Sequence, residues 1–136
     1  MKVKNSVRRI AVGLGVAGLL SAGAVLAGTA TASASTIPFG ELQLCAQGNY
    51  PAFVHVLSVQ GPNGLSTGDS ASTIQSPGQC WMSPVNTLGQ WAQVDVVGLH
   101  PDGSQFYIGS EWYNSSVSGM GIGAEGSSDS PFIWTW

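Results

Sequence analysis

The basic side chains of this chain are confined to its first nine residues, ahead of a long uncharged apolar run. They are Lys2, Lys4, Arg8 and Arg9. The apolar run covers 10–28, is rich in Gly and Ala, and is followed by the small-residue site Ala32-Ser33-Ala34. A basic start, an apolar middle and an A-x-A end are the three parts of a secretory signal peptide. The sequence therefore predicts a signal peptide at 1–34 and one domain at 35–136.

Two alternatives accompany this interpretation of the N-terminus. The apolar run is long enough for a membrane helix, so a retained N-terminal anchor is the alternative to cleavage after Ala34. The Arg8-Arg9 pair leaves the twin-arginine export route open beside ordinary secretion. We expect cleavage, because the small-residue site follows the apolar run directly, and we expect the protein to be extracellular.

Removal of the signal peptide leaves a strongly acidic domain without Lys or Arg. Its carboxylates are Glu41, Asp69, Asp95, Asp102, Glu111, Glu125 and Asp129. Nucleic-acid binding draws its affinity from cationic side chains that neutralise phosphates, and an anionic membrane surface repels a domain of this charge. The sequence therefore predicts no nucleic-acid partner and, after cleavage, no membrane partner.

Two cysteines, Cys45 and Cys80, allow one pairing. A secreted domain of about 100 residues has a modest core and often depends on a covalent cross-link. The chain-entropy estimate for a loop of this length is roughly 3–4 kcal/mol. The cysteines lack C-x-x-C spacing and the carboxylates lack a D-x-D-x-D cluster. We expect a disulfide, no metal and no cofactor.

The mature segment has the pattern of an all-β protein. Turn signals recur about every ten residues, as in "GPNG" at 61–64 and "HPDGS" at 100–104, and short β-branched and aromatic runs lie between them. The spacing predicts a small single-domain β-sandwich of Ig-like type with seven or eight short strands. A small β-barrel is the runner-up.

Alternation along the runs predicts which side chains share a face. In 41–46, Leu42, Leu44 and Ala46 lie together. In 91–96, Ala92, Val94 and Val96 oppose Trp91, Gln93 and Asp95. In 105–113, Phe106, Ile108 and Trp112 oppose Tyr107, Glu111 and Tyr113. The faces with charged members are predicted to contact solvent.

Two glycine motifs are interpreted as structural. The G-x-G-x-x-G at 121–126 has no room for the helix that a dinucleotide site needs. Its alternating glycines predict a strand with one bare face, which aromatic rings cover. The G-x-S-x-G at 64–68 lies in a polar loop of a domain too small for a nucleophile elbow. His55, His100, the acids and the serines show no spacing typical of a catalytic triad, so we expect no enzymatic activity.

The aromatic residues are the strongest candidates for a binding surface. All five tryptophans lie in the mature segment: Trp81, Trp91, Trp112, Trp134 and Trp136. Core packing is expected for Trp134 and Trp136. Trp91 and Tyr113 share faces with charged residues, and with Trp81 they are candidates for stacking on sugar rings or for contact with a protein partner.

The stretch "GQCWMSPV" at 78–85 resembles the reactive loop of the secreted subtilisin inhibitors of actinomycetes. There, a Cys two positions before an apolar residue rigidifies the scissile segment. The resemblance implies that Met82-Ser83 is a bait bond for a serine protease.

The phrases "LCAQGNY", "SPGQC" and "FYIGS" resemble those of small secreted proteins of Streptomyces-type bacteria. This resemblance implies secretion and a compact β domain. Taken together, the sequence predicts a secreted, non-catalytic binding or structural protein with a protein or polysaccharide partner. A protease inhibitor using Met82 and a carbohydrate-binding module using exposed aromatic side chains are the two specific alternatives.

Overall fold

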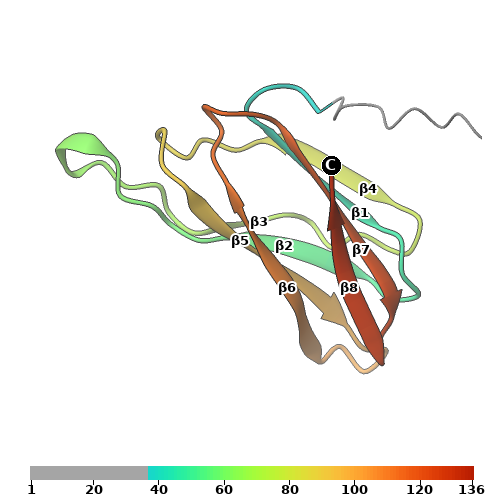
Figure 1. The fold of residues 1–136 in the computed structure, drawn as a ribbon. Helices are drawn as coiled ribbons and strands as arrows, with labels where there is room; N and C mark the ends of the chain where they lie inside the picture. Colours follow the sequence, from blue (N-terminus) through green and yellow to red (C-terminus); the bar gives the residue numbers. More distant parts are fainter. Residues whose placement is uncertain (1–36) are drawn as a thin grey trace, which may run out of the picture. The chain divides into compact units, whose positions relative to one another are not determined.

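The computed structural model describes residues 37–136, so the predicted signal peptide lies outside the described residues. Eight strands form two four-stranded sheets (Figure 1). Sheet A has the order β4-β1-β7-β8 and sheet B the order β3-β2-β5-β6. The strands are β1 Glu41–Ala46, β2 Ala52–Val56, β3 Ser70–Ala71, β4 Cys80–Pro84, β5 Ala92–Leu99, β6 Gln105–Tyr113, β7 Met120–Ser127 and β8 Ser130–Thr135. The predicted two-sheet sandwich is confirmed.

Strand pairing is antiparallel except between β1 and β7, which run parallel. The β5–β6 and β7–β8 pairs are hairpins, and the predicted turn at 100–104 closes the first of them. The His100 N–H donates to the Ser104 carbonyl at 2.8 Å there, and the Gly103 N–H donates to the His100 carbonyl at 2.9 Å. The Asp102 carboxylate also accepts from the Ser104 N–H at 2.9 Å.

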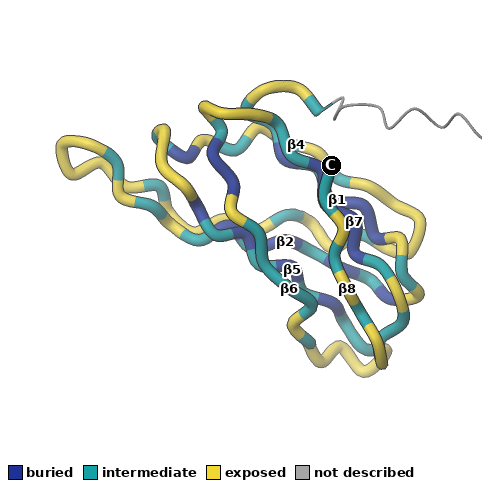
Figure 2. Tube along the Cα trace, viewed as in Figure 1, coloured by how far each residue is buried: buried dark blue, intermediate teal, exposed yellow. Residues whose placement is uncertain are grey.

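The core lies between the two sheets and is built from alternate residues of their inner strands (Figure 2). Leu42, Leu44 and Ala46 are fully buried, as predicted. Val94 and Val96 are also fully buried, and Ala92 is almost fully buried. Removing side chains of this kind from water contributes about 25 cal/mol per Å² of apolar surface. The alternation read from the sequence therefore correctly assigns the inner faces of β1 and β5.

The predicted disulfide joins Cys45 to Cys80, with Cα atoms 4.0 Å apart. The two cysteines are direct cross-strand neighbours in the β1–β4 pair, so the bond ties edge strand β4 to the centre of sheet A. A structural disulfide in a small domain is consistent with an oxidising, extracellular compartment.

A β-bulge in β6 overturns the predicted faces of that strand. Val96 lies opposite Gly109 and Val97 opposite Tyr107, so Ile108 is an extra residue. One extra residue exchanges the two faces of everything beyond it. Trp112 is consequently on the outer face and 58% exposed, whereas Tyr113 is fully buried. The prediction that Tyr113 contacts solvent is wrong.

The glycine-rich segment forms strand β7, and a strand follows it, not a helix. The Trp136 indole occupies the space that a Cβ at Gly121 would need, and the Phe132 ring lies beside Gly126. Gly119 instead faces the backbone of Ile37 and Pro38. The prediction that aromatic rings cover the glycine face is thus confirmed for Gly121, Gly123 and Gly126, but not for Gly119. The G-x-G-x-x-G motif is therefore structural.

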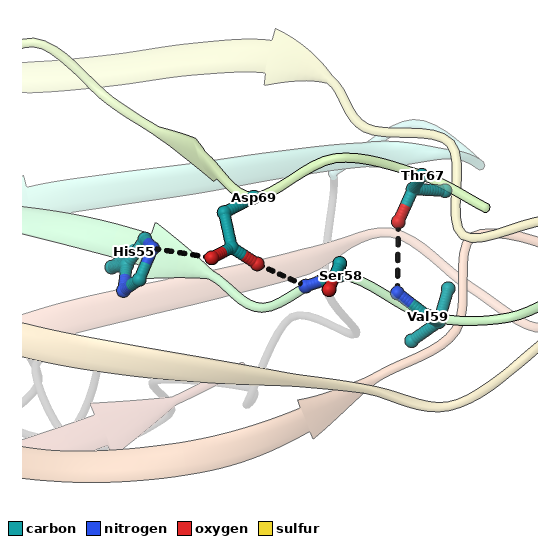
Figure 3. Close-up of polar contacts among 5 residues, drawn as sticks. All are labelled: His55, Ser58, Val59, Thr67 and Asp69. Carbon is teal, nitrogen blue, oxygen red and sulfur yellow. Dashed lines mark hydrogen bonds and ion pairs between the residues drawn. The ribbon is translucent and has the colours of Figure 1, made fainter.

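The segment 57–69, which we call the arm, extends beyond the sandwich between β2 and β3 (Figure 1). Side chains on its returning limb bond the backbone of the outgoing limb (Figure 3). Asp69 Oδ1 accepts from the Ser58 N–H at 2.6 Å, and Thr67 Oγ1 accepts from the Val59 N–H at 2.9 Å. The G-x-S-x-G motif lies in this arm, not at a strand-to-helix turn.

Candidate binding surfaces

Each sheet presents an outer face that carries exposed aromatic side chains. On sheet B the outer side chains of β5 and β6 face solvent because their neighbours along each strand fill the core. The exposed aromatic residues on this face are Trp91, Tyr107 and Trp112, exposed by 56%, 61% and 58%. Exposed aromatic groups of this size on one face mark an interaction site more often than scattered apolar residues do.

Two of these tryptophans lie at the same end of the β5–β6 pair. Trp112 lies directly opposite Gln93, and Trp91 precedes Gln93 by two residues. Trp91 and Trp112 therefore occupy diagonal cross-strand positions on the same face. Diagonal neighbours in an antiparallel pair are about 7–8 Å apart at the backbone, which is within reach of aromatic side chains.

Hydrogen bonds between loops fix the backbone that carries Trp91. Asn114 Nδ2 donates to the Gly89 carbonyl at 3.0 Å, just before Trp91 and just after β6. Thr87 and Ser115 bond each other's backbone N–H groups through their hydroxyls, both at 3.1 Å. Thr87 and Asn114 are buried, which protects these bonds from water. The backbone at Trp91 is therefore held in place before a ligand binds. Binding consequently costs little conformational entropy in this loop.

Polar side chains lie next to the two tryptophans. Gln93 Nε2 donates to Asp95 Oδ1 at 2.7 Å. Asp95 lies opposite Ser110 on one side and opposite His55 on the other. Ser110, Asp95 and His55 thus form a row across three strands, beside the row of Gln93 and Trp112.

The order within that row does not match a hydrolytic triad. A triad places the imidazole between the hydroxyl and the carboxylate. Here the carboxylate strand is central, so Ser110 and His55 lie two strands apart, about 9–10 Å at the backbone. His55 Nε2 instead lies 3.9 Å from Asp69 Oδ2 at the base of the arm (Figure 3).

The Asp69 carboxylate is held in its charged form. Its bond from the Ser58 N–H is the main reason that its pKa lies below the ordinary value of 3.8, and His55 adds a smaller contribution. A similar arrangement lowers the pKa of Asp102, whose carboxylate accepts from the Ser104 hydroxyl and N–H. Asp69 therefore joins the two limbs of the arm at its base, and Asp102 stabilises the turn at 100–104.

Trp81, Met82 and Ser83 all lie in strand β4, at the edge of sheet A. Trp81 packs against the core and is half-buried. Met82 points outward and is 49% exposed. Met82 lies opposite Gln43 and Ser83 opposite Leu42, so the Met82-Ser83 bond belongs to the β1–β4 ladder and is not on a protruding loop.

The outer face of sheet A carries the C-terminal aromatic residues. Phe132 and Trp134 are 51% and 60% exposed, and Trp136 is half-buried over Gly121. Exposed and partly buried positions alternate along β8 (Figure 2). The expectation that Trp134 packs in the core is wrong, because Ile133 takes the inward position on this strand.

Sequence reasoning identified Trp91 but missed Trp112 as its partner. Trp112 was missed because the bulge at Ile108 moves it to the outer face, and no residue type in β6 indicates a bulge at that position. The even spacing of Phe132, Trp134 and Trp136 did show that the three share a face. The spacing did not show whether that face points to the core or to solvent, because the intervening residues, Ile133 and Thr135, are also compatible with a core.

Within residues 37–136, no cluster of three or more His, Cys, Asp or Glu side chains has an arrangement that could hold a metal ion. The same part of the chain contains no helix with the length and apolar character required to cross a membrane.

The chain matches no protein-family profile and no curated protein sequence. Among solved structures it resembles parts of bacterial toxins. A structure described as a Gram negative toxin has 15% identity over 73% of this chain and 23% of its own, with a TM-score of 0.50. A disulfide-locked mutant of intermedilysin with human CD59 has 16% identity over 71% of this chain and 24% of its own, also at 0.50. The chain spans less than a quarter of these proteins, and the likeness is one of fold.

Proposed function

We propose that this chain is an extracellular, non-catalytic binding protein, and that the outer face of sheet B binds a neutral polysaccharide. One observation carries the proposal. Trp91 and Trp112 are both more than half exposed and occupy diagonal positions on one face. Exposing such rings to water is unfavourable, and a ligand that covers them removes this cost; a flat indole suits the apolar face of a sugar ring.

The polar groups beside the rings supply hydrogen bonds for sugar hydroxyls. The Gln93–Asp95 pair leaves one carboxylate oxygen available, and Ser110 adds a hydroxyl in the next row. A surface of aromatic rings with a few placed polar groups is the usual composition of a ligand site, in which the polar groups fix orientation.

The charge of the domain selects the class of polysaccharide. Residues 35–136 carry seven carboxylates and no Lys or Arg. An acidic polysaccharide would be repelled at ordinary ionic strength, because charges within about 8–10 Å of each other still interact. A neutral polymer such as cellulose or chitin meets no such barrier.

A binding function without catalysis also agrees with the row of Ser110, Asp95 and His55. The carboxylate lies between the other two groups, so the row cannot pass a proton from the hydroxyl to the imidazole. These side chains are better placed to hold a hydroxyl group than to cleave a bond.

Retention on insoluble cellulose and chitin tests the proposal. We expect the exported protein to bind at least one of them, and Trp91→Ala or Trp112→Ala to weaken binding about tenfold, which corresponds to about 1.4 kcal/mol. Trp134→Ala is the matched control, because that ring is equally exposed on the opposite sheet. No retention of the unaltered protein, or retention that survives both sheet B substitutions, would contradict the proposal.

Inhibition of a serine protease is the second candidate, favoured by the exposure of Met82 two residues after the disulfide. Strand β4 is an edge strand, so a protease could pair with its free side. Tight inhibition of subtilisin that is lost in Met82→Asp would support this candidate, and its absence would remove it.

A further inference from the structure

The outer face of sheet A contains a polar site among its aromatic rings. Cross-strand pairing places Gly123 between Cys45 on β1 and Trp134 on β8. Because Gly123 has no side chain, its neighbours can approach the space above it. Two side-chain oxygens and one aromatic ring lie close to that space.

The position that a Cβ would occupy at Gly123 is the reference point for the distances to its neighbours. Glu125 Oε1 would lie 3.2 Å from it, Gln47 Oε1 3.3 Å and Trp136 Cζ3 3.5 Å. A carboxylate oxygen, an amide oxygen and the edge of an indole therefore converge on one point. Trp134, directly opposite Gly123, is 60% exposed beside them.

The Glu125 and Gln47 side chains are not occupied with each other or with a neighbour. Within residues 37–136, neither side chain takes part in a hydrogen bond or ion pair, although the backbone carbonyl of Glu125 accepts from the Tyr50 hydroxyl at 2.5 Å. Two free acceptors near the exposed Trp134 indole have the chemistry that binds a cation: the oxygens accept from its N–H groups, and the ring face attracts its charge.

We propose that this site, made of Glu125, Gln47, Trp134 and Trp136, binds a Lys or Arg side chain of a basic segment of a partner protein. The carboxylate and amide oxygens accept from the ammonium or guanidinium group. Trp134 covers the aliphatic stem of the same side chain, and its ring face adds a cation–π contact.

Charge complementarity selects this occupant over a second copy of the chain. A copy of the domain would bring seven more carboxylates and no Lys or Arg to the face. Like charges brought together across an interface cost free energy and suppress that pairing. A basic partner gains from the whole field of the domain as well as from the site.

The direct test is titration of the exported protein, with its N-terminus verified by mass, with the peptide Ac-GLKLKLG-amide. Tryptophan fluorescence or calorimetry reports binding. We expect binding that weakens as salt is added, and no binding of the same peptide with both lysines acetylated. Equal binding of the acetylated peptide would overturn the proposal, because no cation would then be recognised.

Matched variants separate the site from the general charge of the domain. Glu125→Gln and Asp129→Asn each remove one carboxylate at nearly constant shape, and Asp129 is exposed in the β7–β8 turn. We expect Glu125→Gln and Trp134→Ala to weaken binding about three- to tenfold, and Asp129→Asn and Trp112→Ala to weaken it less than twofold. Equal losses in Glu125→Gln and Asp129→Asn would show that only net charge matters and would overturn the proposal.

Sedimentation of the protein alone tests the competing occupant. A dimer that is lost in Trp134→Ala would mean that a second copy covers this face, which would also overturn the proposal. A monomer at all concentrations is the expected result. Neither result affects the polysaccharide site, which lies on the other sheet and is tested with an uncharged ligand.

Discussion

The indole of Trp136 lies directly over Gly121 and occupies the position that a side chain at Gly121 would need. The two residues also exchange backbone hydrogen bonds, from the Gly121 N–H at 3.0 Å and from the Trp136 N–H at 3.1 Å. The C-terminal residue is thus tied to sheet A by its backbone and by its ring. This contact explains why a strand in the sheet carries glycine where a β-branched residue would otherwise be favoured.

Gly121→Ala should therefore destabilise the domain by about 1–3 kcal/mol, because the new methyl group displaces the Trp136 ring. Urea unfolding followed by tryptophan fluorescence measures this change. Gly68→Ala is the control, because a Cβ at Gly68 meets nothing within 4 Å and its φ is not positive. The control should change the free energy of unfolding by less than about 0.5 kcal/mol. A similar loss in both variants would contradict the role assigned to the ring.

Two buried tyrosines make a second matched pair. The Tyr113 hydroxyl has no hydrogen-bond partner within the described residues, and burial, with the Glu41 carboxylate, raises the pKa of Tyr113 to about 12. Leaving a polar group buried without a partner costs about 1–3 kcal/mol. Tyr113→Phe should thus raise the free energy of unfolding by about 1 kcal/mol.

Tyr50→Phe should lower the free energy of unfolding by about 1 kcal/mol, because it removes the bond to the Glu125 carbonyl. Both rings stay in place in these variants, so the comparison isolates the hydroxyls. Equal destabilisation by the two substitutions, measured in urea, would show that the Tyr113 hydroxyl has a partner after all.

The arm should loosen in acid as Asp69 takes up a proton. The folded-state pKa of Asp69 is lowered, so the stabilising bond from the Ser58 N–H is complete above pH 3.8 and is lost as the pH falls through the folded value. The Ser58 amide signal in NMR should therefore shift with a midpoint below 3.8, and Asp69→Asn should abolish that titration. The Val59 amide, bonded to the Thr67 hydroxyl, should not follow it. A midpoint at or above 3.8 would contradict the assignment.

Replacement of both cysteines, Cys45→Ala with Cys80→Ala, should lower the free energy of unfolding by roughly 3–4 kcal/mol, because the unfolded chain regains the freedom of the loop. This is a large share of the 5–15 kcal/mol typical of a small domain. Equilibrium unfolding in urea measures the loss. Because β4 pairs with β1 over its whole length, we expect the variant to keep the same far-UV circular dichroism at low temperature. A loss below 1 kcal/mol would contradict a structural role for the bond.

Much of the fold could be predicted because period-two alternation and turn residues are local signals. They assigned the inner faces of β1 and β5 and the hairpin at 100–104 correctly. The bare face of β7 was also predictable, since alternating glycines leave room that large aromatic side chains fill. The disulfide followed from there being one possible pair.

The error at Tyr113 has a specific physical origin. Alternation is counted along one strand, whereas the face of a residue depends on pairing with the neighbouring strand. The bulge at Ile108 is set by that pairing, and it exchanges Trp112 with Tyr113. Only half of the candidate site could be predicted for the same reason: Trp91 adjoins β5, which has no extra residue, whereas Trp112 follows the bulge in β6.

The most direct test of the polysaccharide proposal follows the five indole N–H signals by NMR during titration with soluble chito- and cello-oligosaccharides. Single Trp→Phe variants assign the signals. The account predicts that the Trp91 and Trp112 signals shift together and saturate, while those of Trp81, Trp134 and Trp136 stay in place. Saturation that moves Trp134 and leaves Trp91 and Trp112 unchanged, or no shift with either sugar, would contradict it.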